Sequence, residues 1–178
     1  MRALLLALTC AFALVAAAMA PSRGDAEIAA PIKDFFGQYK GQGIAKNRDS
    51  LDFYRSLRDL DTIIEAAGEG GFTVKWTTVI RDTEGGRKID NSMTFIPSGK
   101  ANVFKTADSG DPVAKGSYAW ARIDGRTLTI NVLEVGEEGA GRWQVYERRL
   151  TGDGMELTFR RLDNTGALRI VSGKLKRQ

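Results

Sequence analysis

The sequence predicts an all-β protein, a single antiparallel up-and-down β-barrel of about eight to ten strands with a short helical turn before the first strand. Three observations predict this fold. From Tyr39 onward the chain is built of short segments in which apolar and polar residues alternate. Short glycine-containing turns join nearly all of these segments. Beyond the opening turn, only residues 49–58 have a helical pattern.

The first twenty residues have the layout of a secretory signal peptide. Arg2 precedes an uncharged apolar run that ends in small residues, with Ala18-Met19-Ala20 or Ala16-Ala17-Ala18 as the cleavage signal. A membrane anchor is the alternative, since a run of about 18 residues lies at the lower limit for spanning a bilayer. The alanine-rich end favours cleavage. We therefore predict a signal peptide at residues 1–20, a flexible leader at 21–31 and one barrel domain at 32–178, periplasmic or secreted, with no transmembrane segment after cleavage.

Residue types that are missing exclude several kinds of chemistry. The sequence contains no histidine, and its one cysteine, Cys10, lies in the predicted signal peptide. Without these side chains, serine and cysteine triads and thiolate metal sites are excluded. We predict no catalytic residues, no metal and no cofactor, and an enzyme is the weakest of the functions considered. The net charge of +4 comes from interspersed acids and bases, so no nucleic-acid partner is predicted.

The elements follow in order along the chain. Residues 32–36 are expected to form one helical turn. The clearest strand is Phe72–Ile80, where Phe72, Val74 and Trp76 share a face with alternating polar neighbours. Asp124-Gly125 is a dipeptide typical of two-residue hairpin turns. Further strands are predicted at 57–66, 88–96, 101–106, 117–123, 127–134, 142–150, 155–162 and 167–174. Consecutive hairpins place these strands side by side, and closure into a barrel removes both sheet edges.

The segment from Phe35 to Gly43, FFGQYKGQG, contains three closely spaced glycines. A dinucleotide-binding loop would need a preceding strand and a following helix, and this segment has a turn before it and a strand after it. Glycines inside a first strand instead let the strand bend sharply or let another backbone approach it.

Gly37-Gln38-Tyr39, after a short turn and before a long meander, resembles the start of proteins of the calycin superfamily, the lipocalins and fatty-acid-binding proteins. Tyr39 stands where lipocalins have tryptophan, and their second and third motifs are not found. The resemblance implies that Tyr39 plugs the closed end of the barrel. It also implies an arginine partner from the last strand, with Arg160, Arg161 and Arg169 as candidates.

Large aromatic side chains in the predicted strands suggest a ligand cavity. A small barrel is either filled by side chains or holds one small ligand, and both alternatives remain open here. For the cavity, strand alternation predicts these ligand-contacting residues: Phe72, Trp76, Phe95, Tyr118, Trp120, Trp143, Phe159 and Arg161.

Charged pairs supply further candidates. Arg148-Arg149 and Arg160-Arg161 each place one arginine inward if alternation holds, either to bind a ligand carboxylate or to cap the barrel end. In Arg58-Asp-Leu-Asp61, the two carboxylates share a face, which suits either acid–base work or a solvated strand surface.

These features predict an exported envelope protein that binds a small apolar or amphipathic ligand, such as a lipid, inside a barrel. The alternative is a non-enzymatic envelope protein with a filled core, which binds a protein partner through its surface.

Overall fold

The computed structural model describes residues 31–47, 55–81, 86–107, 111–115, 117–164, 166 and 168–178. The predicted signal peptide and nearly all of the leader lie outside the described residues, as does most of the helix candidate at 49–58.

The described chain forms a closed antiparallel barrel of ten strands in up-and-down order, as the sequence predicts. A 3₁₀ turn, Ile32–Phe35, comes first. The strands are β1 (Gly37–Asn47), β2 (Arg55–Ala67), β3 (Gly71–Ile80), β4 (Arg87–Pro97), β5 (Val103–Thr106), β6 (Ser117–Asp124), β7 (Thr127–Val135), β8 (Gly141–Leu150), β9 (Gly154–Asp163) and β10 (Leu168–Arg177), with helix α1 (Pro112–Lys115) between β5 and β6. Pairing of β1 with β10 closes the barrel.

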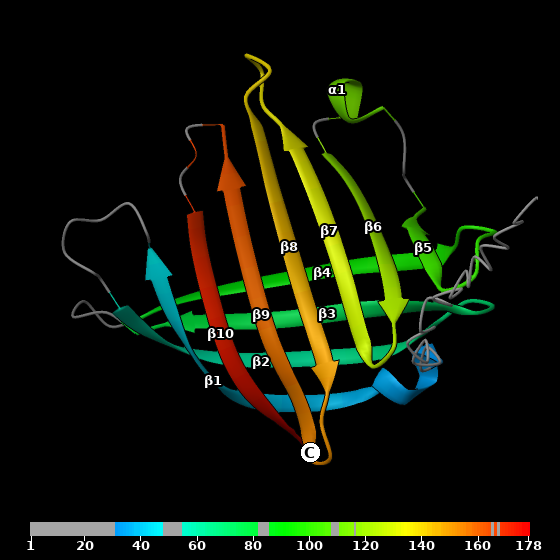
Figure 1. Ribbon diagram of the computed structural model, residues 1–178, viewed down its shortest axis with the longest axis vertical. Helices are drawn as coiled ribbons and strands as arrows, with labels where there is room; N and C mark the ends of the chain where they lie inside the picture. The colour runs from blue at the N-terminus through cyan, green and yellow to red at the C-terminus, as the bar shows by residue number, and fades with distance from the viewer. Residues whose placement is uncertain are drawn as a thin grey trace, which may run out of the picture.

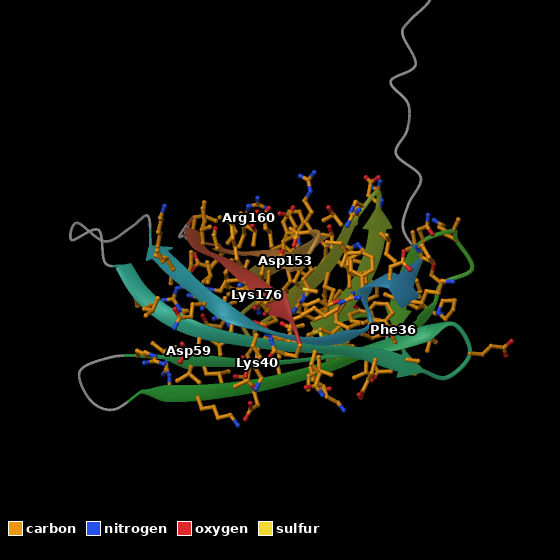
Figure 2. All side chains as sticks on the ribbon, turned by 90° about the horizontal axis from the view of Figure 1, so that it is seen from below. Phe36, Lys40, Asp59, Asp153, Arg160 and Lys176 are labelled. Atoms are coloured by element: carbon orange, nitrogen blue, oxygen red, sulfur yellow. The ribbon has the colours of Figure 1, made fainter. Side chains whose placement is uncertain are left out.

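The barrel is flattened into two layers. Strands β2 to β4 run across strands β6 to β10 in Figure 1, and β1 bends from one layer into the other. Many side chains point into the space between the layers, whereas others, including Lys40, project from the outside (Figure 2). No helix among the described residues is long and apolar enough to span a membrane.

Two local predictions are corrected. The predicted helix at 49–58 is wrong over Arg55–Arg58, because these residues begin strand β2. Ser56 and Leu60 lie on the buried face of this strand. Helix α1 is not predicted from the sequence, because four residues are too few to show helical periodicity. Asp111 supports this helix, since its Oδ1 accepts a hydrogen bond from the backbone N–H of Val113 at 2.9 Å.

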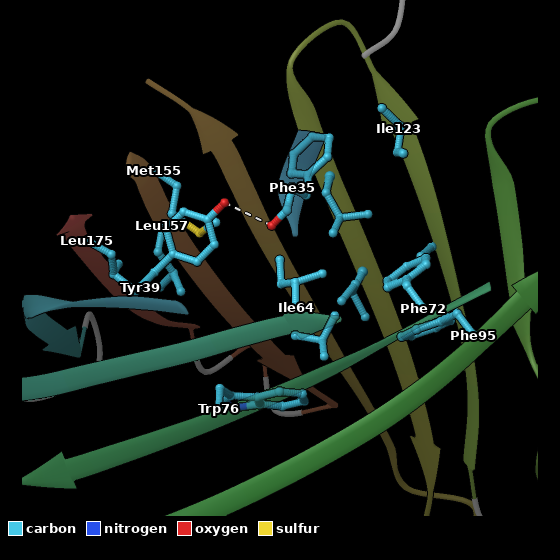
Figure 3. Close-up of a cluster of buried hydrophobic side chains, with 14 of the residues drawn as sticks. Phe35, Tyr39, Ile64, Phe72, Trp76, Phe95, Ile123, Met155, Leu157 and Leu175 are labelled. Atoms are coloured by element: carbon cyan, nitrogen blue, oxygen red, sulfur yellow. Dashed lines mark hydrogen bonds between the residues drawn. The ribbon is translucent and has the colours of Figure 1, made fainter. Parts of the chain in front are cut away.

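One end of the barrel is closed and filled. Phe72 stacks on Phe95 with ring centroids 5.1 Å apart (Figure 3). The rings of Phe104 and Phe72 meet edge to face, with centroids 5.0 Å apart. The fully buried side chains at this end also include Phe35, Tyr39, Ile64 and Leu128. This half of the barrel is therefore packed core.

Tyr39 plugs this closed end. Its hydroxyl donates a hydrogen bond to the carbonyl of Phe35 at 2.9 Å (Figure 3) and accepts one from Nη2 of Arg177 at 2.5 Å. The Arg177 guanidinium also lies 5.2 Å from the centre of the Tyr39 ring. An aromatic plug held by an arginine from the last strand is present, but the arginine is Arg177.

The three arginines expected as partners of Tyr39 lie elsewhere. Arg160 is on the outer face and pairs with Glu147 at 2.8 Å. Arg161 and Arg169 line the other end of the barrel. The pairing register of β1 and β10 explains why these arginines do not reach Tyr39, because Tyr39 lies opposite the last residues of β10.

Replacing Tyr39 by phenylalanine is expected to cost about 1–2 kcal/mol of unfolding free energy, because a buried hydrogen-bonding hydroxyl is lost. Urea unfolding of the variant measures this cost. Tyr118→Phe is the control, because Tyr118 belongs to the outward row of β6 and is partly exposed. Equal effects of the two substitutions would contradict the assigned role of Tyr39.

The seam between β1 and β10 depends on close backbone approach. A Cβ atom on Gly41 would lie 1.9 Å from the carbonyl oxygen of Lys174, and one on Gly43 would lie 2.6 Å from Cδ1 of Leu60. The glycines of FFGQYKGQG are therefore required where the first strand bends and meets the last.

Candidate ligand-binding cavity

The other half of the barrel encloses a cavity of about 210 Å³. Strands β2, β3, β4, β8, β9 and β10 line it. The polar and aromatic side chains that line it include Arg58, Thr62, Trp76, Tyr146, Arg148 and Arg161. From the sequence, both a filled and a hollow barrel remain possible. The structure combines the two, with a packed core at the closed end and a cavity toward the opposite end. We call this opposite end the mouth.

Arg148 lies deep in this cavity. It is the largest fully buried side chain among the described residues, with 0% exposure. Its guanidinium carbon lies 5.5 Å from the centre of the Trp76 ring and 5.6 Å from that of Tyr146. None of its three guanidinium nitrogens has a hydrogen-bond partner. Burial lowers the pKa of Arg148 to about 10, so it remains a cation at neutral pH.

A buried charge without a counter-ion is costly. The effective penalty for removing an ion from water is several kcal/mol. Two cation–π contacts return at most a few kcal/mol, because one desolvated contact is worth about 2 kcal/mol. Part of the cost therefore remains, and an anion beside Arg148 would offset it.

The other unpartnered polar atoms lie in the same place. Among the described residues, the buried side-chain atoms without a hydrogen bond are those of Arg148, Thr62 Oγ1 and Arg58 Nε. All three residues line the cavity. Buried polar groups are normally satisfied, and these groups are placed so that they could donate hydrogen bonds to an acceptor inside the cavity.

Arginines also gather at the mouth of the cavity. The pKa of Arg58 is lowered mainly by burial, and the charges of Arg169, Arg87 and Arg161 lower it further. Burial likewise lowers the pKa of Arg169, followed by the charges of Arg161 and Arg87. Arg58 and Arg169 therefore each lie within electrostatic range of Arg87 and Arg161 at this end of the barrel.

The nearby carboxylate of Glu134 is already engaged. Its Oε1 accepts a hydrogen bond from Gln144 at 2.7 Å, and its Oε2 pairs with Arg142 at 3.0 Å. Gln144 in turn accepts a hydrogen bond from the Tyr146 hydroxyl at 2.9 Å. Burial raises the pKa of Tyr146 to about 12, so this chain holds a neutral phenol against the cavity.

Three of the residues predicted to contact a ligand border the cavity, namely Trp76, Phe159 and Arg161. The rings of Trp76 and Tyr146 lie 5.1 Å apart and those of Tyr146 and Phe159 4.7 Å apart, which makes a continuous aromatic wall from β3 to β9. Phe72 and Phe95 also point inward, but they belong to the filled end.

Tyr118, Trp120 and Trp143 lie on the outer face and do not line the cavity. In β6, the fully or nearly buried row is Ala119, Ala121 and Ile123, and the aromatic residues between them face outward. Trp143 is 47% exposed, opposite the equally exposed Leu162. Small residues occupy the inward row of β6 because Phe104 and Ile130, which lie opposite Ala121 on the neighbouring strands, already fill that space.

Arg148 is predicted from the sequence only as one of a pair, outside the set of ligand-contacting residues. A signal was present, since Arg148 shares its strand face with Tyr146 and Leu150. An arginine in an apolar row is the pattern that identifies it.

The paired carboxylates of β2 have a structural explanation. Asp59 lies on the outer face, where Arg81 donates to it at 2.7 Å and Gln42 at 3.1 Å. These hydrogen bonds lower the pKa of Asp59. Asp61 borders the cavity but belongs to the outward row, opposite Thr77. In the part of the chain that the structure describes, no cluster of three or more acids, histidines or cysteines could hold a metal ion.

Comparison with known proteins shows the fold alone. No family model matches the chain. No curated protein matches its sequence. Among solved structures, the chain is similar to a protein of unknown function from the DUF3598 family of Nostoc punctiforme, with a TM-score of 0.54 and 14% identity. The match covers 84% of this chain and 50% of that one, so this chain corresponds to about half the length of its structural neighbour.

Proposed function

We propose that this protein binds a small amphipathic anion inside the barrel, with the anionic group on Arg148. The observation that carries the proposal is the fully buried guanidinium of Arg148, without a hydrogen-bond partner, at the side of a cavity. A carboxylate, phosphate or sulfonate there would make charge-assisted hydrogen bonds with it, which are about twice as strong as neutral ones.

The walls of the cavity suit the rest of such a molecule. Trp76, Phe159 and Leu157 offer apolar surface beside the arginine. Apolar walls with a few convergent polar groups are typical of small-molecule sites. The ligand is therefore an acid with an apolar or aromatic body.

Two broader proposals accompany this one. The Tyr39–Arg177 plug supports a relationship to the calycin superfamily. The apolar segment from Ala3 to Ala20 supports export to the periplasm or the cell exterior, so that the protein would carry or sense its ligand in the envelope.

The first test is the intact mass of protein expressed as the full chain and purified gently. We expect a mass excess under native conditions that disappears on denaturation, with an organic acid in the extract. The denatured mass also reports whether the first twenty residues are removed.

The second test uses Trp76 as a reporter in a Trp120→Phe/Trp143→Phe background, where it is the one tryptophan left of three. Octanoate is expected to change its fluorescence, and octanol, which has the same chain without the charge, is expected to bind about tenfold or more weakly. Equal responses to both probes, or no response to octanoate, would contradict the proposal.

A protein that acts through its surface is the second candidate. The exposed pair Trp143 and Leu162 on the outer face favours it. The absence of both a native mass excess and a Trp76 response would favour this candidate instead.

A further inference from the structure

We infer that the ligand carries two anionic groups, one bound by Arg148 and the second held at the mouth by Arg58 and Arg161. This inference rests on the proposed function and defines the class of ligand. It is carried by the contrast between the arginines inside the barrel and those outside it.

Outside the barrel, several arginines have acidic partners. Arg81 pairs with Asp59 at 2.7 Å, Arg122 with Asp124 at 2.6 Å and Arg160 with Glu147 at 2.8 Å. Each pair lies on the outer face, where water also solvates the charge.

Inside the barrel, the pattern is the opposite. Arg58 Nε is buried without a partner, and no described residue gives Arg161 a hydrogen bond or an ion pair. Both residues line the cavity together with Arg148. Among the described residues, these partly buried arginines thus have no acidic partner beside the fully buried Arg148.

Within the described ranges, the acids near the mouth are engaged by other residues or belong to an outward row. Glu134 is engaged by Arg142 and Gln144. Asp163, opposite Arg142 at the end of β9, is not free either. Asp61 belongs to the outward row of its strand.

Arg148 and Arg161 lie at two levels of the cavity. Arg148 lies opposite Leu157, and Arg161 is four residues farther along β9 toward the mouth. Four residues of strand span about 13 Å at 3.3 Å per residue. An anionic group bound to Arg148 does not offset the repulsion between Arg58 and Arg161 at the mouth. A second anionic group at the other end of the ligand would bind both arginines and offset it.

The test compares octanoate with octanedioate, which has the same chain length and a second carboxylate. Binding is followed by Trp76 fluorescence in the single-tryptophan protein at low salt, with hexanedioate and decanedioate to find the best spacing. We expect the best dicarboxylate to bind about 10- to 100-fold more tightly than the monocarboxylate of equal length.

Variants assign the second group to the mouth. Arg161→Met and Arg58→Met are expected to weaken octanedioate binding more than octanoate binding and so to remove most of the dicarboxylate advantage. Cooperative urea unfolding shows that both variants fold. Arg161→Lys should retain part of the advantage. Arg149→Met is the control, because Arg149 is exposed and faces Glu156 outside the barrel.

The outcomes separate this inference from the proposed function. Failure of every carboxylate to bind would overturn both. If octanoate binds and every dicarboxylate binds equally or more weakly, only the two-anion inference is overturned. The same follows if the dicarboxylate advantage survives in both mouth variants.

Discussion

Replacing Arg148 by methionine is expected to give a protein that is more stable and no longer binds octanoate. Methionine fills much of the same space and removes the buried charge, whose penalty is several kcal/mol. The loss of two cation–π contacts, about 2 kcal/mol for a desolvated contact, offsets part of the gain. We expect a net increase in unfolding free energy of about 1–3 kcal/mol.

The same substitution removes the group that we propose to bind the anion. Octanoate affinity is expected to fall about 30-fold or more, as in the loss of one partner of a buried charge pair. Urea unfolding and Trp76 titration measure the two effects on one sample. Arg149→Met should leave both quantities nearly unchanged.

The combination of the two effects is what tests the site. A structural role for Arg148 predicts a less stable variant, whereas a binding role predicts a more stable one with weaker binding. A destabilised Arg148→Met protein that binds octanoate normally would refute the assignment of this arginine.

Gly41→Ala is expected to cost about 3 kcal/mol or more of unfolding free energy, at the upper end of the cost of overpacking. The new Cβ would lie 1.9 Å from the carbonyl oxygen of Lys174 and 2.8 Å from Cα of Leu175. Both contacts are backbone, so no side-chain rotation relieves them. The strands that close the barrel must separate locally, which weakens the β1–β10 pairing.

Gly141→Ala is the matched control for this prediction. Gly141 also lies in a strand, and a Cβ there would have nothing within 4 Å. Its effect is expected to stay within about 0.5 kcal/mol. Thermal and urea unfolding of both variants measure the difference, and equal stability of the two would mean that the seam tolerates a side chain at Gly41.

Much of the fold is visible in local patterns. The alternation in Phe72–Ile80 identifies β3 and its inward face, and the structure confirms both. The glycines after Phe36 indicate a first strand that bends, because only glycine admits a backbone as close as that of Lys174. Trp76, Phe159 and Arg161 follow from the same alternation and border the cavity.

Alternation alone does not say which row of a strand faces inward. In β6, the larger residues Tyr118 and Trp120 suggest the core, yet the alanines between them are buried. The neighbouring strands decide this, because Phe104 and Ile130 already occupy the space opposite Ala121.

The sequence by itself determined the all-β class, the order of hairpins and the need for glycine in the first strand, since each follows from residues close together in the chain. Only the tertiary structure decided which arginine supports Tyr39 and which arginine is buried. Arg177 reaches Tyr39 across the closing seam, and Arg148 meets Trp76 across the barrel interior. These contacts join distant strands, so register and closure determine them rather than local sequence.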